Sequence, residues 1–88
     1  MTLRVQKYGG TSVSTTNNIE KIAGKIAEDY SKGDDFVIVV SAMGETTDEL
    51  INLAKQISDN PDLREMDKIL STGENISSSL LAMCFHNL

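Results

Sequence analysis

Two glycine- and hydroxyl-rich stretches hold the residues of this chain that could do chemistry. The stretch KYGGTS spans residues 7–12, and the stretch SAMGETT spans residues 41–47. Glycine lets the backbone approach a ligand closely, and backbone amides at a helix start attract anions. A lysine beside such amides could balance the negative charge that spreads over oxygens during phosphoryl transfer. The two stretches therefore have the composition of a phosphate-binding site, with Lys7 as its charged group.

The same glycines would also suit an ordinary tight turn between a strand and a helix. The first stretch matches neither GxxxxGK(S/T) nor GxGxxG, so it carries no standard nucleotide-binding fingerprint. Cys84 is most simply a buried small hydrophobe, and His86 is most simply a surface residue. The sequence shows no metal-ligand cluster and no Ser-His-Asp arrangement. The residue types alone leave the phosphate site and the plain turn both open.

The elements that must position these stretches follow a strand–helix–strand order. Leu3–Tyr8 alternates in polarity, which predicts a strand, and residues 17–32 carry an amphipathic stripe, which predicts a helix ended by Gly33. Residues 36–40, FVIVV, are continuously apolar and predict a strand covered on both faces. This order is a βαβ unit, and it implies a parallel sheet with helices on its faces.

The loops that follow the two strands, residues 9–14 and 41–47, are expected to face one crevice. Parallel sheets bind ligands beyond the carboxyl ends of their strands, and both loops leave such ends. Helices are also predicted after residue 46, after Asp62 and after residue 74, with a break at Asn60–Pro61 and another at Ser71–Gly73. Three pairs with capping-box spacing predict helix starts, namely Asn17 with Glu20, Thr46 with Glu49, and Ser71 with Glu74.

Composition and charge exclude several classes of protein. The chain has 88 residues, 40% of them hydrophobic and 24% charged, which is a globular composition and not a disordered one. A net charge of −5 disfavours nucleic-acid and anionic-membrane partners. A site for a negative ligand would therefore depend on local backbone groups and on nearby lysine.

Cysteine usage and hydropathy predict a cytoplasmic protein. Cys84 is the single cysteine, so no internal disulfide can form. The N-terminus has no apolar run like a signal peptide, and no stretch approaches ~18 apolar residues. Two predicted strands leave sheet edges unpaired, and no composition shift precedes Leu88. We therefore expect residues 1–88 to be the first part of a larger α/β domain, with exposed edges that favour self-association.

Three blocks of the sequence together resemble one family. VQKYGGTSV, VIVVSAMGETTDELINLAKQI and LSTGENIS resemble, in order and separation, the aspartate kinases of the amino-acid kinase superfamily. The resemblance covers nearly all 88 residues. It implies an α/β fold, a three-layer α/β/α sandwich with a mainly parallel sheet. Residues 1–88 would be the N-terminal part of its catalytic domain, without the remainder of that domain and without the ACT regulatory domains.

The resemblance also implies an activity, transfer of the γ-phosphate of ATP to the side-chain carboxylate of L-aspartate. The product would be 4-phospho-L-aspartate, which feeds lysine, threonine, methionine and diaminopimelate synthesis. Mg²⁺ would arrive with ATP, and no residue is assigned to a metal. ATP and L-aspartate would be the partners, nucleic acid and membrane would not, and the full-length parent is expected to form homo-oligomers.

Individual residues take roles from the same resemblance. Lys7 is similar to the lysine that balances charge on the transferring phosphoryl group, and is the expected catalytic residue. The residues expected to bind ATP are Lys7, Tyr8, Gly9, Gly10, Thr11 and Ser12. The residues expected to bind aspartate are Ser41, Thr47 and Glu74.

Two departures from the family pattern matter. Ser14 stands where the family usually has glycine or alanine, which would be harmless unless φ is positive there. The chain is also much shorter than family members, so the isolated 88 residues are expected to lack kinase activity. Two alternatives stay open, a related kinase that acts on glutamate, carbamate or UMP, and a non-catalytic, self-associating fragment.

Overall fold

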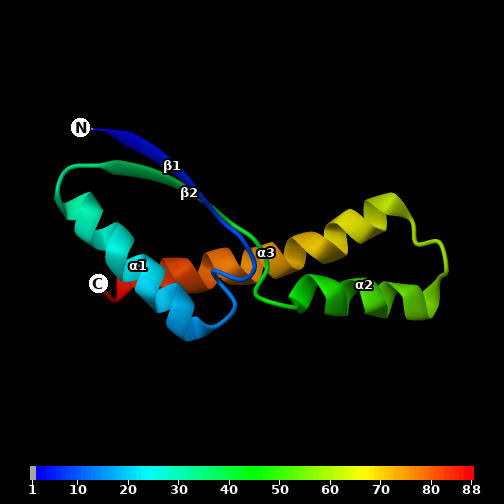
Figure 1. Ribbon diagram of the computed structural model, residues 1–88. Helices are drawn as coiled ribbons and strands as arrows, with labels where there is room; N and C mark the ends of the chain where they lie inside the picture. Colours follow the sequence, from blue (N-terminus) through cyan, green and yellow to red (C-terminus); the bar gives the residue numbers. More distant parts are fainter. Residues whose placement is uncertain (1) are drawn as a thin grey trace.

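The computed structural model describes residues 2–88, which form two strands and three helices (Figure 1). The element order is β1 (Leu3–Tyr8), α1 (Thr16–Ser31), β2 (Asp35–Val40), α2 (Thr46–Ile57) and α3 (Leu63–His86). β1 and β2 pair in parallel, with Tyr8 opposite Val40. The predicted α/β class and the βαβ unit with adjacent parallel strands are therefore confirmed.

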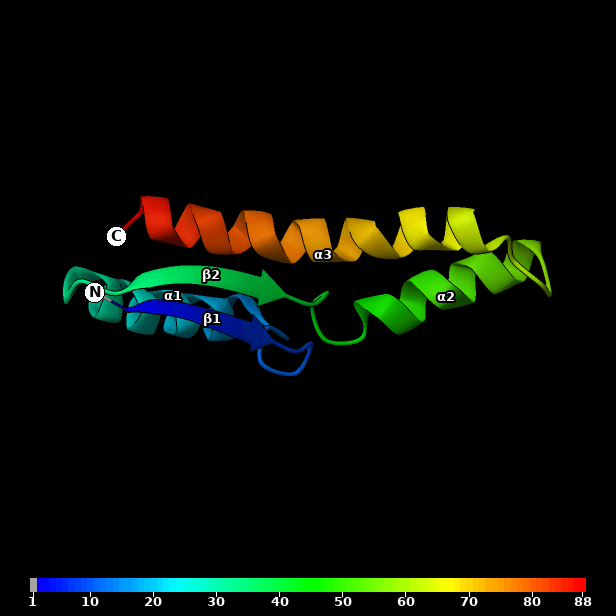
Figure 2. The ribbon, with the colours of Figure 1, turned by 90° about the horizontal axis from the view of Figure 1, so that it is seen from above.

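The sheet is covered on one face only. Figure 1 shows α1 and α3 on the same side of the strands, and these two helices pack against each other. Figure 2 shows α1 behind the strands and α3 alongside β2. Side chains alternate accordingly, since Ile38 packs against the core while Val5 and Val37 are 70% and 49% exposed. The prediction that residues 36–40 are covered on both faces is wrong for the described residues, because both helices that contact the sheet lie on one side of it.

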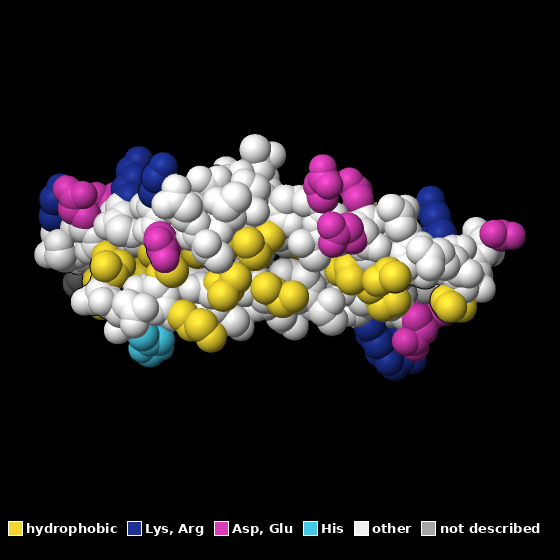
Figure 3. All heavy atoms as spheres, turned by 90° about the horizontal axis from the view of Figure 1, so that it is seen from below, with side chains coloured by type: hydrophobic (Ala, Val, Ile, Leu, Met, Phe, Trp, Pro, Cys, Tyr) yellow, Lys and Arg dark blue, Asp and Glu magenta, His cyan; other side chains and the backbone are white. Residues whose placement is uncertain are grey.

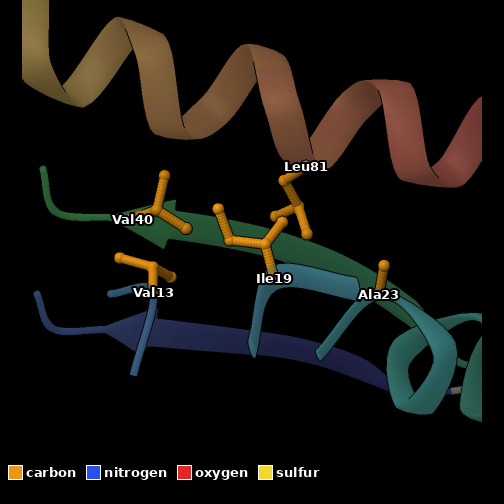
Figure 4. Packing of buried hydrophobic residues seen from close by; sticks show 5 residues of the cluster. All are labelled: Val13, Ile19, Ala23, Val40 and Leu81. Carbon is orange, nitrogen blue, oxygen red and sulfur yellow. The ribbon is translucent and has the colours of Figure 1, made fainter. Parts of the chain in front are cut away.

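The core lies at the carboxyl ends of the strands, behind the two loops. Val40 is the last residue of β2, and Val13 belongs to the loop after β1; both are buried. Leu81 of α3 points toward Ile19 of α1 between the sheet and the helices (Figure 4). The cluster of buried residues consists of Val13, Ile19, Ala23, Val40 and Leu81. Packing therefore anchors the loop after β1 directly.

The molecule is elongated because α2 and α3 form a helical hairpin that extends beyond the sheet (Figure 1). Its principal extents are 50 × 24 × 19 Å, and its radius of gyration is 15.4 Å. A compact chain of this length has a radius of gyration of about 12 Å. Its accessible surface of 6271 Å² likewise exceeds the about 5,100 Å² expected for a compact protein of this mass.

Much apolar surface stays uncovered in this shape. None of the residues of α2 is buried, and Ile57 near its end is 90% exposed. Figure 3 shows hydrophobic side chains in a band along the long axis of the molecule. None of the helices within residues 2–88 combines the length and the apolar composition that a membrane-spanning helix requires.

One predicted helix break is wrong, because α3 runs without interruption through Ser71 and Gly73. The hydroxyls of Ser71 and Thr72 donate to carbonyls of their own helix, at 2.8 Å and 2.6 Å. Gly73 is buried where α3 passes the β2–α2 turn, so tertiary packing outweighs its low helix propensity. Glu74 therefore lies inside a helix, and its predicted capping box with Ser71 does not form.

The predicted capping boxes of the first two helices are also absent. α1 begins after Thr15, whose extended backbone lets its hydroxyl accept from the Asn18 amide at 3.1 Å; Asn17 lies inside the first turn. α2 begins after Glu45 with no side-chain capping bond. The predicted end of α1 is confirmed, since the Gly33 amide, at φ +106°, donates to the Tyr30 carbonyl at 3.0 Å.

Candidate functional site

The loops after β1 and β2 touch each other at the carboxyl end of the sheet. The Ser41 amide donates to the Tyr8 carbonyl at 3.0 Å, and the Gly44 amide donates to the Gly10 carbonyl at 3.1 Å. A Cβ atom on Gly10 would lie only 3.1 Å from the Ala42 carbonyl oxygen. The loops therefore meet as predicted, and close approach explains why Gly10 has no side chain.

The loop after β1 leaves backbone groups available to a ligand. The Val13 amide donates to the Gly9 carbonyl at 3.3 Å, and the buried Val13 side chain holds the loop against the core. Among residues 2–88, no backbone hydrogen bond is donated by Thr11 or Ser12, which are both exposed. A Cβ atom built on Gly9 meets nothing within 4 Å. This loop thus offers free amides beside open space, the arrangement that suits an anionic oxygen.

Lys7 and Tyr8, the last two residues of β1, lie on opposite faces of the sheet. Lys7 pairs with Val39 in register, and its side chain is exposed on the uncovered face. No ion pair of Lys7 occurs in the described part of the chain. The Tyr8 side chain packs against the core, and its hydroxyl donates to the Gln6 Oε1 atom at 2.7 Å. The Lys7 ammonium is thus available to an anionic ligand, whereas the Tyr8 side chain contributes to packing.

The turn after β2 depends on Gly44, whose φ of +44° lies in the left-handed region. The Thr46 amide donates to the Met43 carbonyl at 2.9 Å and so closes the turn at the start of α2. Thr47 is exposed in the first turn of that helix. Gly44 packs against Ser14, which has no positive φ, so serine at position 14 causes no backbone strain.

The two helix starts differ in charge. The first turn of α1 contains no acidic residue, whereas the first turn of α2 contains Asp48 and Glu49. Amides at a helix start favour an anion, and nearby carboxylates oppose it and favour a cation. The start of α1 therefore suits a phosphate better, and the start of α2 suits a substrate that carries an ammonium group.

Glu74 lies beside the β2–α2 turn although it is far from that turn in sequence. Its neighbour Gly73 packs so closely that a Cβ atom there would lie 2.9 Å from the Ala42 Cβ and 3.3 Å from the Thr46 Cγ2. The Glu74 side chain is exposed. The structure thus brings together all three predicted segments, residues 7–12, residues 41–47 and Glu74.

Sequence reasoning missed the contact of Ala42 with Gly73. Both residues are small and buried, but Ala42 lies in the β2–α2 turn and Gly73 lies inside α3. No local pattern signals such a pair, because the contact joins residues that are 31 positions apart. Over the described range 2–88, no group of three or more His, Cys, Asp or Glu residues could hold a metal ion.

Comparison with known proteins finds one matching family and several relatives that are aspartokinases. The amino acid kinase family matches residues 2–88. The aspartokinase of Geobacillus stearothermophilus is 58% identical over 86 residues, which are 98% of this chain and 21% of that protein. Aspartokinase 2 of Bacillus subtilis (strain 168) is 53% identical over 83 residues, which are 94% of this chain and 20% of that protein.

A solved structure has the same backbone arrangement. The crystal structure of aspartate kinase from Synechocystis matches 99% of this chain with a TM-score of 0.94 and 48% sequence identity, and the match covers 15% of that chain. The 88 residues therefore span about a fifth of the length of the curated relatives that they match.

Proposed function

The chain belongs to the amino acid kinase family, and from that premise we propose that it is the N-terminal part of the catalytic domain of an aspartate kinase. The aspartokinases at 53–58% identity support this substrate class. The elongated shape and the uncovered sheet face support a place within a larger domain, because a compact independent domain would bury more apolar surface. We call the longer protein of this proposal the parent.

In the proposed reaction a side-chain carboxylate oxygen of L-aspartate attacks the γ-phosphorus of ATP. The bond from that phosphorus to the bridging oxygen breaks, ADP leaves, and 4-phospho-L-aspartate forms. The protein needs no covalent intermediate, because positioning and charge compensation lower the barrier. Lys7 would supply the compensating charge, since its ammonium has no ion-pair partner among the described residues.

The single observation that carries the proposal is the hydrogen bond from the Gly44 amide to the Gly10 carbonyl at 3.1 Å. It joins the loop suited to phosphate with the turn suited to the acceptor, so both substrates would meet at one edge of the sheet. Gly9, Gly10, Thr11 and Ser12 would receive the ATP phosphates through backbone amides. Tyr8 would contribute only through its place at the end of β1.

The acceptor would lie at the second loop. Ser41 and Thr47 would offer hydroxyl groups to the aspartate carboxylates, and Glu74 would hold the α-amino group in a charge-assisted hydrogen bond. The acidic residues Asp48 and Glu49 in the first turn of α2 support an ammonium-bearing ligand there. The same charges disfavour the triphosphate at this loop, which keeps the two substrates in distinct places.

Mg²⁺ would enter with the nucleotide and neutralise charge on its phosphate oxygens when bound. We also propose that the parent is cytoplasmic, that it forms homo-oligomers, and that its product feeds the lysine, threonine, methionine and diaminopimelate pathways. We expect the isolated 88-residue chain to be inactive and to self-associate through its uncovered sheet.

Substitution of Lys7 tests the assigned chemistry. In the parent, Lys7→Ala should lower kcat by about 10²–10³-fold, as loss of a single preorganised charge-stabilising donor does. Lys25→Ala is the matched control, because Lys25 is an exposed lysine on α1 that forms no ion pair in the described part of the chain. Unchanged turnover in Lys7→Ala would remove Lys7 from the mechanism.

A further inference from the structure

We infer that Gly73 is a positioning residue, which sets the place of Glu74 relative to the β2–α2 turn through its contact with Ala42. The inference rests on the proposed function, because it concerns how the aspartate subsite is assembled. Gly73 would touch no substrate. It would act by letting α3 approach the turn more closely than any other residue allows.

Ala42 is where the three segments of the site meet. Its exposed fraction is 4%, and two glycines approach it closely, Gly10 of the loop after β1 and Gly73 of α3. A Cβ atom on Gly10 would lie 3.1 Å from the Ala42 carbonyl oxygen. A Cβ atom on Gly73 would lie 2.9 Å from the Ala42 Cβ. The turn is thus in close contact with both the phosphate loop and α3.

A side chain at position 73 would displace the atoms that pack against Gly73. Carbon atoms of packed side chains prefer separations of about 3.5–4.0 Å, so a Cβ atom 2.9 Å from another is roughly 0.6–1.1 Å too close. The turn is also held by the loop after β1, because the Gly44 amide donates to the Gly10 carbonyl at 3.1 Å. The helix α3 must therefore shift, and it carries Glu74 with it.

The shift affects the two substrates differently. Glu74 follows Gly73 directly in α3, so it moves away from the β2–α2 turn and from Thr47 in the first turn of α2. The loop of residues 9–12 is held instead by the buried Val13 side chain and by the hydrogen bond that the Gly10 carbonyl accepts from the Gly44 amide. Displacement of about 1 Å can cost about 10²-fold in rate when a binding group leaves its productive place. The KM for aspartate should therefore rise far more than the KM for ATP.

The test uses four forms of the parent: the unaltered protein, Gly73→Ala, Ala42→Gly, and the double variant. Gly73→Ala should lower kcat/KM for aspartate by about 10–100-fold, mainly through KM, and change the KM for ATP less than about 3-fold. Ala42→Gly removes the colliding methyl group, so the double variant should recover most of the loss. This rescue is the signature of a packing contact that positions the site.

Gly24→Ala supplies the matched control. Gly24 is also a helix glycine, but a Cβ atom there meets nothing within 4 Å. This variant should keep the unaltered KM for aspartate, which separates the contact at Gly73 from a general effect of alanine in a helix.

The outcomes are distinct. If the unaltered parent does not phosphorylate aspartate, the proposed function fails and this inference fails with it. If the parent is active but Gly73→Ala keeps its KM for aspartate, only the inference is overturned. It is also overturned if the double variant stays as impaired as Gly73→Ala, or if the KM values for ATP and aspartate rise together.

Discussion

Replacing Gly44 by alanine tests whether the β2–α2 turn depends on a left-handed backbone. The φ of Gly44 is +44°, a region that costs most residues with a side chain about 1–2 kcal/mol and that asparagine and aspartate tolerate better. Crowding adds little, since a Cβ atom there would meet Ser14 atoms at 3.6–3.8 Å, an ordinary contact distance. If the turn changed its φ instead, the amide bond to Gly10 would be lost, at about 0.5–1.5 kcal/mol.

Together the two routes predict that Gly44→Ala lowers the free energy of unfolding of the 88-residue chain by about 0.5–2 kcal/mol. Gly44→Asn is the comparison, because asparagine adopts positive φ several times more often than alanine and should lose less than half as much. In the parent, Gly44→Ala should also weaken aspartate binding, since the turn carries Ser41 and leads into Thr47.

Urea denaturation followed by circular dichroism measures the difference in free energy between the three forms. Gly24→Ala should shift the same measurement the other way, by about 0.5–1 kcal/mol, because its helix has room for the methyl group. The reasoning is refuted if Gly44→Ala is as stable as the unaltered chain, or if Gly44→Asn is the less stable of the two.

Three further predictions concern the free energy of unfolding. Arg4→Met should lower it by about 1–2 kcal/mol, because the half-buried Arg4 side chain, 38% exposed, pairs with Asp29 at 3.0 Å and with Asp34 at 3.3 Å. The loss should shrink in 1 M salt, and a loss that does not depend on salt would contradict its ionic origin. Ile19→Ala should cost about 2–5 kcal/mol, since Ile19 is 1% exposed, and thermal unfolding that matches the unaltered chain would place Ile19 outside the core. Val5→Thr should change the free energy of unfolding of the 88-residue chain by less than about 0.5 kcal/mol, because Val5 is 70% exposed. In the parent the same substitution should cost about 1–3 kcal/mol, because a second layer would cover that face of the sheet. Equal effects in both proteins would argue against a covered face.

The sequence was sufficient for the elements whose pattern is local. The alternation in Leu3–Tyr8 and the apolar stripe of α1 each predict an element whose bounds the structure matches within one residue. The parallel pairing then follows from the order of elements, because a crossover helix forces it. That pairing alone brings the loops after β1 and β2 to one edge of the sheet.

The misses have a different cause, because each depends on contacts between distant segments. Ser71 and Gly73 are typical of a helix break, yet α3 continues since Gly73 packs against Ala42. The apolar run in β2 predicts two covered faces, but both helices pack on one side and leave Val37 half-exposed. A short window of residues determines neither how closely α3 approaches the β2–α2 turn nor which face of the sheet the helices cover.

The central claim is that the two loops hold ATP and L-aspartate together, and the acceptor specificity of the parent tests it most directly. The parent would be incubated with Mg-ATP and, in separate reactions, with L-aspartate, L-glutamate, carbamate or UMP. ADP release reports turnover, and hydroxylamine traps any acyl phosphate as a hydroxamate. We predict turnover and hydroxamate with aspartate alone, and no turnover by the isolated 88 residues. Turnover with glutamate, carbamate or UMP and none with aspartate would contradict the assignment of the second loop.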